Sequence, residues 1–411
     1  MTAVFLSCRS ARHFLKSDSG PDADVRHPSH TSWQEHGRNI PNPDQAHGRG
    51  TSKNMPIIKD PHLFNEQSLF VDLEGVLGCR LYLKIEGFNF AGSIKLKPAR
   101  EMVERAEREG LIGPGSILVE SSSGNLGVAL SMIAASKGYR FVCVIDPRCN
   151  LATRQLMESL GAQVDLVTEP DPVDGFLGAR LNHVQDLCAS DARYIWLNQY
   201  TNPGNWGAHY RWTAPEISNQ FPELDVLFVG AGTTGTLMGC ARYFHEHRPE
   251  VRIVAVDAAG SVSFGGQPAT RLIPGLGMSV RPPQLDESLI DDVVMVEELD
   301  TVRACHRLAA AGFMLGGSTG TVVHGATSWL ADHAAQDLTA AAISPDMGRP
   351  YLDTVYNPDW VHDHFGAEAL ATADLTAAPG RRSDPVSAAQ HPAPVPVGNY
   401  VATAALGNYV Q

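Results

Sequence analysis

Lys95 is the residue whose position points most directly to chemistry, because it stands where an apolar run gives way to an amphipathic pattern. Residues 89–95 read Asn-Phe-Ala-Gly-Ser-Ile-Lys, and we expect a helix to begin there. The positive end of a helix dipole disfavours an ammonium group, and burial does so as well. Both effects favour the neutral amine, the form that attacks an aldehyde to give a Schiff base. The alternative is a solvated lysine in an ordinary first turn.

Three small-residue segments lie farther along the chain, each after an apolar run and before a helical pattern. Residues 120–127 read Glu-Ser-Ser-Ser-Gly-Asn-Leu-Gly, and residues 230–236 read Gly-Ala-Gly-Thr-Thr-Gly-Thr. Residues 316–320 read Gly-Gly-Ser-Thr-Gly. Backbone amides at a helix N-terminus, helped by hydroxyl groups, bind anions. The segment 230–236 is therefore a candidate phosphate site.

A lysine, an asparagine loop, a glycine-threonine loop and a late serine, in that order, resemble the fold-type II pyridoxal-phosphate enzymes. This is the superfamily of cysteine synthase and cystathionine β-synthase, and the resemblance covers roughly residues 56–365. It implies pyridoxal 5'-phosphate as the cofactor and amino acids as substrates. It also implies an α/β fold of two three-layer domains with mostly parallel sheets.

The resemblance assigns a role to each matching residue. Lys95 would carry the cofactor and act as the catalytic base, and Asn125 would hydrogen-bond the phenolic oxygen of the cofactor. Ser318, with Thr319 beside it, would face the pyridine nitrogen, and a hydroxyl there favours β-elimination over transamination. The residues expected to hold the cofactor phosphate are Gly232, Thr233, Thr234, Gly235 and Thr236.

Substrate contacts are expected from a second set of residues. They are Ser121, Ser122, Ser123, Gln199, Arg271 and Gly275. The guanidinium group of Arg271 suits a phosphate leaving group. At Leu126 the chain departs from the cysteine synthase pattern, which has a threonine there, and this leaves the second substrate open. No metal ligand is expected.

Two longer stretches, residues 121–130 and 351–360, resemble one branch of the superfamily. That branch joins O-phospho-L-serine to L-glutamate and so makes a precursor of 2,3-diaminopropionate for siderophores or peptide antibiotics. The alternative within the family is a cysteine synthase that acts on O-acetylserine or O-phosphoserine.

Two hypotheses from other functional classes account for fewer of these residues. Gly230, Gly232 and Gly235, with Asp257 after the next apolar run, match the dinucleotide-binding fingerprint of an oxidoreductase. That reading leaves Lys95 and the asparagine loop without a role. A protein that binds the cofactor without turnover is not favoured either, because every cofactor residue of the pattern is present.

Short apolar runs alternate with helical patterns in the part of the chain that must position these residues. The expected strands are residues 81–83, 117–119, 141–145, 164–167, 194–197, 226–229 and 253–256. The expected helices include residues 99–109, 127–137, 153–160 and 205–219. This alternation predicts βαβ units, and the unbroken apolar runs predict parallel sheets covered on both faces. Ligands of such sheets bind at the carboxyl ends of the strands.

Composition and resemblance together predict the domain organisation. A larger, phosphate-binding domain is expected from residues 55–86 and 201–366, and a smaller, asparagine-loop domain from residues 87–200. Residues 1–54 are polar with little periodicity, so we expect a disordered N-terminal extension. Residues 367–411 are rich in alanine and proline and predict a flexible, low-complexity tail.

The composition also limits the classes of partner. The 411 residues carry a formal net charge of -13, which argues against binding to nucleic acid or an anionic membrane. The seven cysteines are dispersed, which argues against a disulfide framework and a zinc site. No apolar run reaches the roughly 18 residues of a membrane span. We expect a cytoplasmic protein, and by resemblance a homodimer.

Overall fold

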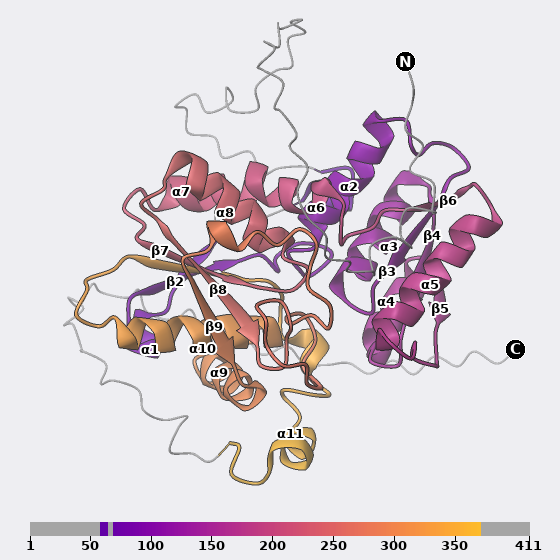
Figure 1. The fold of residues 1–411 in the computed structure, drawn as a ribbon. Helices are drawn as coiled ribbons and strands as arrows, with labels where there is room; N and C mark the ends of the chain where they lie inside the picture. The colour runs from indigo at the N-terminus through magenta and orange to yellow at the C-terminus, as the bar shows by residue number, and fades with distance from the viewer. Residues whose placement is uncertain (1–57, 65–68, 371–411) are drawn as a thin grey trace, which may run out of the picture. The chain divides into compact units, whose positions relative to one another are not determined.

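The computed structural model describes residues 58–64 and 69–370 (Figure 1). The expected disordered segment 1–54 lies outside the described residues, and so does the expected tail from residue 371 onward.

The described strands form two sheets, ordered β1-β2-β10-β7-β8-β9 and β5-β4-β3-β6. The strands are β1 (Phe70–Asp72), β2 (Leu81–Ile85), β3 (Ile117–Ser121), β4 (Arg140–Ile145), β5 (Gln163–Leu166), β6 (Tyr194–Trp196), β7 (Val226–Gly230), β8 (Arg252–Ala258), β9 (Asp292–Val296) and β10 (Ala340–Ser344). Only β1 and β2 pair antiparallel; the other neighbours in the two described sheets are parallel. The predicted α/β class with mostly parallel sheets is therefore confirmed.

Helices cover and connect these strands. They are α1 (Glu74–Leu77), α2 (Leu96–Arg108), α3 (Asn125–Lys137), α4 (Leu151–Ser159), α5 (Gly175–Ser190), α6 (Pro203–Ala208), α7 (Ala214–Gln220), α8 (Gly235–His247), α9 (Glu298–Ala310), α10 (Gly317–Asp332) and α11 (Pro358–Phe365). Short 3₁₀ turns are η3 (Pro61–Leu63), η5 (Glu287–Leu289) and η6 (Arg349–Tyr351), and η4 (His209–Thr213) is π-helical. Among these helices, none has the length and apolar character needed to cross a membrane.

Successive side chains of the larger sheet point into two different cores. Phe228 of β7 packs with Val322 of α10 on one face, whereas Leu227 packs with Leu237 of α8 on the other. Figure 1 shows α7 and α8 along one face of the sheet and α9 and α10 along the other. Both faces are therefore buried, which explains why these strands are apolar without alternation.

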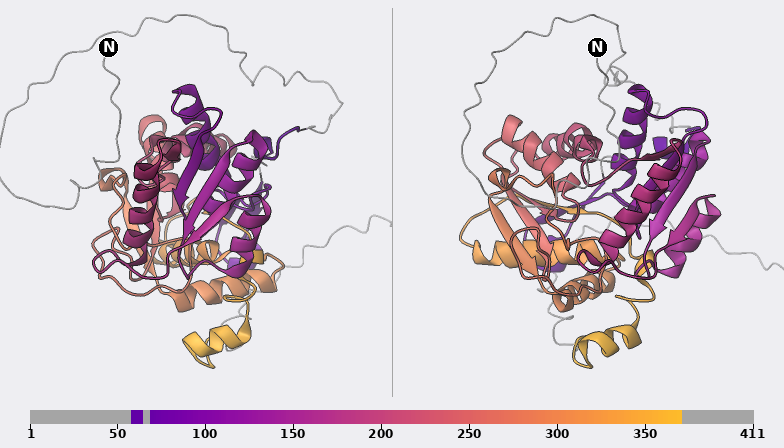
Figure 2. Two further views of the ribbon diagram at one scale, coloured as in Figure 1. Left: turned by 90° about the vertical axis from the view of Figure 1, so that its right-hand side faces the viewer. Right: turned by 45° about the vertical axis from the view of Figure 1, so that its right-hand side comes forward.

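The smaller sheet is layered in the same way. Leu118 of β3 packs in one core with Ile133 of α3, and Val119 packs in another with Val184 of α5. Figure 2, left, turns this side of the molecule toward the viewer, with helices on both sides of the strands. The boundaries of the two expected domains, 87–200 for the smaller one and 55–86 plus 201–366 for the larger, remain predictions.

All seven runs expected to be strands are strands, and the expected helix 205–219 lies within a continuous helical stretch. The segment is divided into α6, η4 and α7. Its middle part, η4, is π-helical, and Pro215 at the start of α7 has no N–H group to donate to the carbonyl of residue 211. The patch 316–320 also follows no described strand; only an isolated bridge between Leu315 and Met347 precedes α10.

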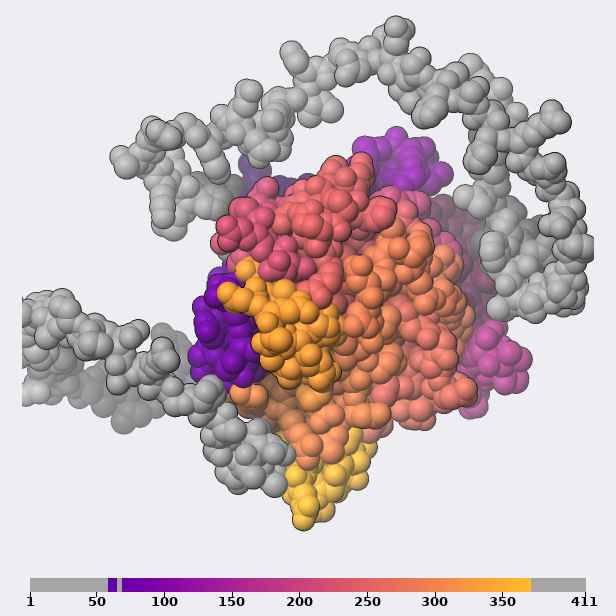
Figure 3. Space-filling view, turned by 60° about the vertical axis from the view of Figure 1, so that its left-hand side comes forward, coloured from indigo at the N-terminus to yellow at the C-terminus, as the bar shows by residue number. Residues whose placement is uncertain are grey.

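Strand β10 was not expected, although it lies between β2 and β7 in the middle of the larger sheet. Its sequence is Ala-Ala-Ala-Ile-Ser, and alanine is depleted in strands, so the run gave no strand signal. Small side chains suit a strand that is buried on both faces. Figure 3 shows N-terminal residues, in indigo, beside orange residues from late in the chain, as the pairing of β2 with β10 requires.

Candidate active site

The carboxyl ends of several parallel strands open on one pocket, with an empty volume of about 520 Å³. Lys95 enters it after β2, Asn125 after β3, and residues 232–236 after β7. Gly275 and Ser318 also line it. The pocket therefore brings together every residue that the sequence assigned to the cofactor, from segments far apart in the chain.

Lys95 lies at the N-terminal boundary of α2 and is partly exposed where it lines the pocket. No acceptor among the described residues is within hydrogen-bonding distance of its amine. Burial lowers the pKa of Lys95, although the nearby carboxylate of Asp346 opposes this shift. The surroundings therefore favour the neutral amine, the form needed for attack on an aldehyde.

The loop 232–236 leads into the N-terminus of α8 and fits an anion. Its backbone N–H groups have no hydrogen-bond acceptor in the part of the chain that the structure describes. Thr234 adopts φ 66°, a left-handed conformation that is strained for a β-branched residue and commonly marks a functional site. A Cβ on Gly232 would lie 2.8 Å from the carbonyl oxygen of Gly275, so only glycine allows this approach.

These observations are consistent with the phosphorylated aldehyde cofactor that the resemblance implies. Free amides at a helix N-terminus suit a phosphate group, and a weakly basic amine suits an aldehyde. Both line the same pocket. We therefore take Lys95 and residues 232–236 as the residues that would hold the cofactor.

Asp346 is a residue of this site that the sequence reasoning missed. It is buried just after β10, and its Oδ2 atom accepts hydrogen bonds from Asn125 Nδ2 at 2.8 Å and from the Tyr351 hydroxyl at 2.6 Å. Burial raises the pKa of Asp346, while these hydrogen bonds and the charge of Lys95 oppose the rise. Asp346 thus fixes the Asn125 amide and sets the electrostatic environment of Lys95. Recognising β10 would have revealed it as a polar residue at a strand carboxyl end.

We predict that Asp346→Ala lowers kcat/KM for the amino-acid substrates about 10- to 100-fold. The variant leaves the Asn125 amide and the Tyr351 hydroxyl without their acceptor, at a cost of about 1–3 kcal/mol. Asp346→Asn keeps an oxygen acceptor, so its kcat/KM should fall much less. Steady-state kinetics of both variants check this, and an unchanged rate in Asp346→Ala would contradict it.

Ser318 lies at the start of α10, where it lines the pocket beside Gly275. The neighbouring Thr319 donates to or accepts from Ser344 Oγ at 2.8 Å and does not line the pocket described here. The geometry therefore favours Ser318 over Thr319 as the residue that would face a ring nitrogen.

Gly275→Ala should destabilise the protein by about 2–5 kcal/mol. Gly275 has φ 112°, which strains any other residue, and an added Cβ would lie 2.1 Å from Ser318 Oγ. Gly265→Ala is the matched control, because Gly265 has φ 80° but no atom within 4 Å of the added Cβ. The free energy of unfolding of that variant should fall by only about 1–2 kcal/mol. Urea unfolding measures both, and equal losses would show that contact with Ser318 is unimportant.

The serines expected to bind substrate have partners within the protein. Ser122 Oγ accepts from the amide of Gly127 at 3.1 Å, and Ser123 Oγ accepts from the amide of Asp146 at 3.0 Å. Ser121 is buried, and its Oγ atom has no partner among the described residues. These contacts shape the loop before α3, and the expected role of the three serines in substrate binding stays a prediction.

Gln199 and Arg271 are also held by the protein. Gln199 Nε2 donates to the carbonyl of Ser121 at 2.9 Å, which ties this segment to the end of β3. Arg271 donates to the carbonyls of Gly260 and Ala269 and, at 3.2 Å, to Ser279 Oγ. Of the described residues, neither of these two is among those lining the pocket. Their contacts with substrate stay predictions.

Comparisons with known proteins agree with this geometry. Residues 68–345 match the family model described as pyridoxal-phosphate dependent enzyme. An N-(2-amino-2-carboxyethyl)-L-glutamate synthase of Ralstonia nicotianae is 41% identical over 283 residues, which cover 68% of this chain and 83% of the relative. A protein of the same name from Cupriavidus metallidurans is 39% identical over 314 residues, covering 75% of this chain and 89% of the relative.

A solved structure also matches this chain. The crystal structure of O-ureido-L-serine synthase matches with a TM-score of 0.67 and 34% identity, covering 75% of this chain and 96% of that chain. The match to the family model extends over most of the chain and includes Lys95, Asn125 and residues 232–236. The chain belongs to the family of pyridoxal-phosphate dependent enzymes.

Proposed function

We propose that this chain is an N-(2-amino-2-carboxyethyl)-L-glutamate synthase. It would condense O-phospho-L-serine with L-glutamate in a β-replacement and release phosphate. The observation that carries the reaction type is the weakly basic Lys95 amine in the same pocket as the free amides of residues 232–236. The choice of substrates rests on the two relatives of that name at 41% and 39% identity.

Each cofactor residue has a place in this proposal. Residues 232–236 would hold the phosphate, Asn125 the phenolic oxygen, and Ser318 the ring nitrogen. When bound, pyridoxal phosphate supplies a sink for the electrons of the bond that breaks at the α-carbon. The protein contributes orientation, charge and proton transfer.

Lys95 would perform the proton transfers. As a neutral amine it takes the α-proton of O-phospho-L-serine, while the bond from the β-carbon to the phosphate oxygen breaks and phosphate leaves. The neutral α-amine of L-glutamate then forms a carbon–nitrogen bond at the β-carbon and loses one proton to solvent. Lys95 returns its proton to the α-carbon, which completes the replacement.

A panel of substrates tests the proposal. The cofactor-loaded protein is mixed with O-phospho-L-serine or O-acetyl-L-serine, and L-glutamate or sulfide is added to each. The proposal expects phosphate release that depends on L-glutamate, with the condensation product identified by mass spectrometry. Cysteine formation with sulfide, and no product with L-glutamate, would instead make the protein a cysteine synthase.

The oligomeric state, the cellular location and the use of the product belong to the same proposal. By resemblance to the family, the enzyme would work as a homodimer in the cytoplasm. Its product would serve as a 2,3-diaminopropionate precursor in siderophore or antibiotic biosynthesis. Light scattering of the purified protein tests the homodimer, and a monomer in solution at working concentration would contradict it.

A further inference from the structure

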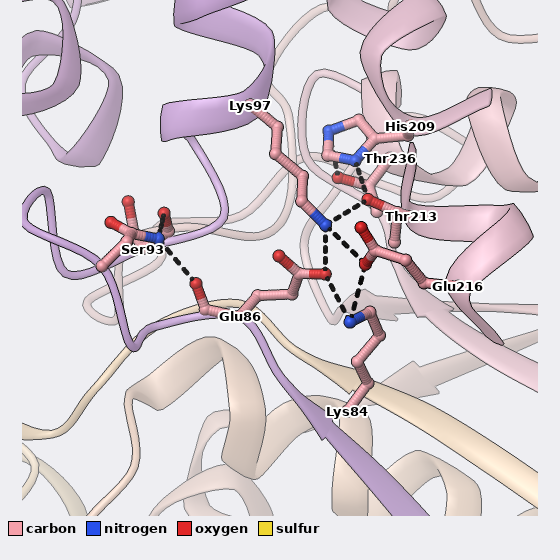
Figure 4. A network of polar contacts seen from close by, with 9 residues as sticks. Lys84, Glu86, Ser93, Lys97, His209, Thr213, Glu216 and Thr236 are labelled. Atoms are coloured by element: carbon pink, nitrogen blue, oxygen red, sulfur yellow. Dashed lines mark hydrogen bonds and ion pairs between the residues drawn. The ribbon is translucent and has the colours of Figure 1, made fainter. Parts of the chain in front are cut away.

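A cluster of buried charges lies beside the pocket and has no part in the proposed reaction. Lys84 and Lys97 share the carboxylates of Glu86 and Glu216 at 2.9–3.3 Å, and all four side chains are buried or nearly so (Figure 4). Lys97 is two residues after Lys95 at the start of α2. Burial lowers the pKa of Lys97, but the charges of Glu86 and Glu216 outweigh it and raise the pKa overall. Lys97 is therefore a fixed cation.

A chain of hydrogen bonds runs from this cation to the pocket. Lys97 Nζ donates to Thr213 Oγ1 at 3.2 Å, and Thr213 Oγ1 lies 3.0 Å from His209 Nδ1. His209 Nε2 lies 3.2 Å from Thr236 Oγ1. His209 and Thr213 are fully buried in η4, whereas Thr236 lines the pocket. The dashed lines of Figure 4 follow this path from the buried charges to Thr236.

The direction of each hydrogen bond follows from the donors available. The ammonium group of Lys97 has three hydrogens and no acceptor, and it contacts three acceptors, on Glu86, Glu216 and Thr213. Thr213 Oγ1 therefore accepts from Lys97 and has one hydrogen of its own to donate. A buried hydroxyl hydrogen without an acceptor is costly, so it is donated to His209 Nδ1.

This donation determines the tautomer of His209. Burial lowers the pKa of His209 to about 3, so the imidazole is neutral and has a single N–H group. Because Nδ1 accepts, the hydrogen is on Nε2 and is donated to Thr236 Oγ1. The hydrogen of Thr236 then has no acceptor among the described residues, and Thr236 is one of the residues that line the pocket.

We propose that Lys97, Thr213 and His209 are positioning residues that orient the Thr236 hydroxyl as a hydrogen-bond donor to an anion in the pocket. The anion is a phosphate group, which under the proposed function belongs to the cofactor. The π-helical turn η4 contributes to this arrangement, because it carries both Thr213, which contacts Lys97, and His209, which contacts Thr236 of α8. Such turns are frequent at functional sites.

Thr213 offers the sharpest test, because it touches neither the pocket nor any ligand placed there. Thr213→Val keeps the shape but removes the donor to His209, whereas Thr213→Ser keeps the hydroxyl. The full-length apoprotein of each is titrated with pyridoxal phosphate and with pyridoxal, which lacks the phosphate. Thr213→Val should weaken the binding of pyridoxal phosphate about three- to tenfold and leave the binding of pyridoxal unchanged. Thr213→Ser should bind both as the wild type does.

A double-variant cycle tests the path through Thr236. Thr236→Val alone should weaken pyridoxal phosphate binding about 10- to 100-fold, and Thr213→Val should add nothing in that background. Losses of pyridoxal phosphate affinity that add in the double variant would overturn the proposal. Equal losses of affinity for pyridoxal would overturn it as well. Urea unfolding of each variant confirms that the titrated protein is folded, and a variant that does not fold is replaced by His209→Asn, matched with His209→Gln. Asparagine loses the donor to Thr236 and should bind weakly, whereas glutamine keeps it and should bind better.

The tautomer gives a readout that is independent of turnover. Nitrogen-15 NMR of the labelled wild-type protein should show His209 protonated at Nε2 and unprotonated at Nδ1. Protonation at Nδ1 would overturn the proposal. Neither this readout nor the titrations depend on which amino acids the enzyme joins, so the proposed reaction can fail while this inference stands.

Discussion

Lys95→Ala should lower the rate of amino-acid turnover about 1000-fold or more. The substitution removes the only proposed general base and the amine that would hold the cofactor, and general acid–base catalysis alone typically contributes about 10²–10⁴-fold. Cofactor should also be lost from the variant on dialysis. Phosphate release and visible absorbance measure the two effects.

Two further lysine variants sharpen this test. Lys95→Arg keeps a positive charge but supplies no neutral amine, so it should be as inactive as Lys95→Ala. Lys137→Ala alters a surface pair with Glu107 and should retain full activity. Activity in Lys95→Arg would contradict the role of a neutral amine, because an arginine side chain is not deprotonated in proteins.

Lys97→Met should have the largest effect on stability, a loss of about 3–5 kcal/mol. The methionine fills a similar volume but leaves the buried carboxylates of Glu86 and Glu216 without one of their two lysines. Lys137→Met is the matched control, because the partly exposed pair with Glu107 contributes only about 0–1 kcal/mol. Chemical denaturation measures both, and equal losses would mean that the buried cluster adds no stability.

The same cluster makes the stability of the folded protein depend on pH in a definite direction. Burial raises the pKa of Glu86, but the charges of Lys97 and Lys84 outweigh it and hold the pKa below its usual value. The stability that Glu86 contributes is therefore present above the pKa of the unfolded chain and is lost as pH falls through the lower folded value. This dependence should largely disappear in Glu86→Gln.

The two lysines show what the sequence does and does not reveal. Lys95 was identified because a local signal marks it: it follows a strand, starts a helix and has small neighbours. Lys97 is only two residues away, but its proposed role depends on Glu216 and Thr213, more than a hundred residues distant in the sequence. Contacts of that separation leave no trace in a single local pattern.

Strand β10 was not predicted, although Asp346 at its end belongs to the site. Runs of valine, isoleucine and leucine marked β3, β4, β7 and β8, and the asparagine loop after β3 and the glycine-threonine loop after β7 were found with them. The alanines of β10 gave no such signal, so Asp346 at its end was missed as well. The hydrogen bond from Asn125 to Asp346 joins residues 221 apart, which only the folded chain brings together.

The most direct test of the central claim is a competition in one tube. Cofactor-loaded protein, O-phospho-L-serine, nitrogen-15 L-glutamate and sulfide are mixed, and the products are identified by mass spectrometry. The proposed function predicts that the label appears in N-(2-amino-2-carboxyethyl)-L-glutamate, in an amount equal to the phosphate released and absent with Lys95→Ala. Phosphate release matched by unlabelled cysteine, with the label remaining only in glutamate, would contradict it.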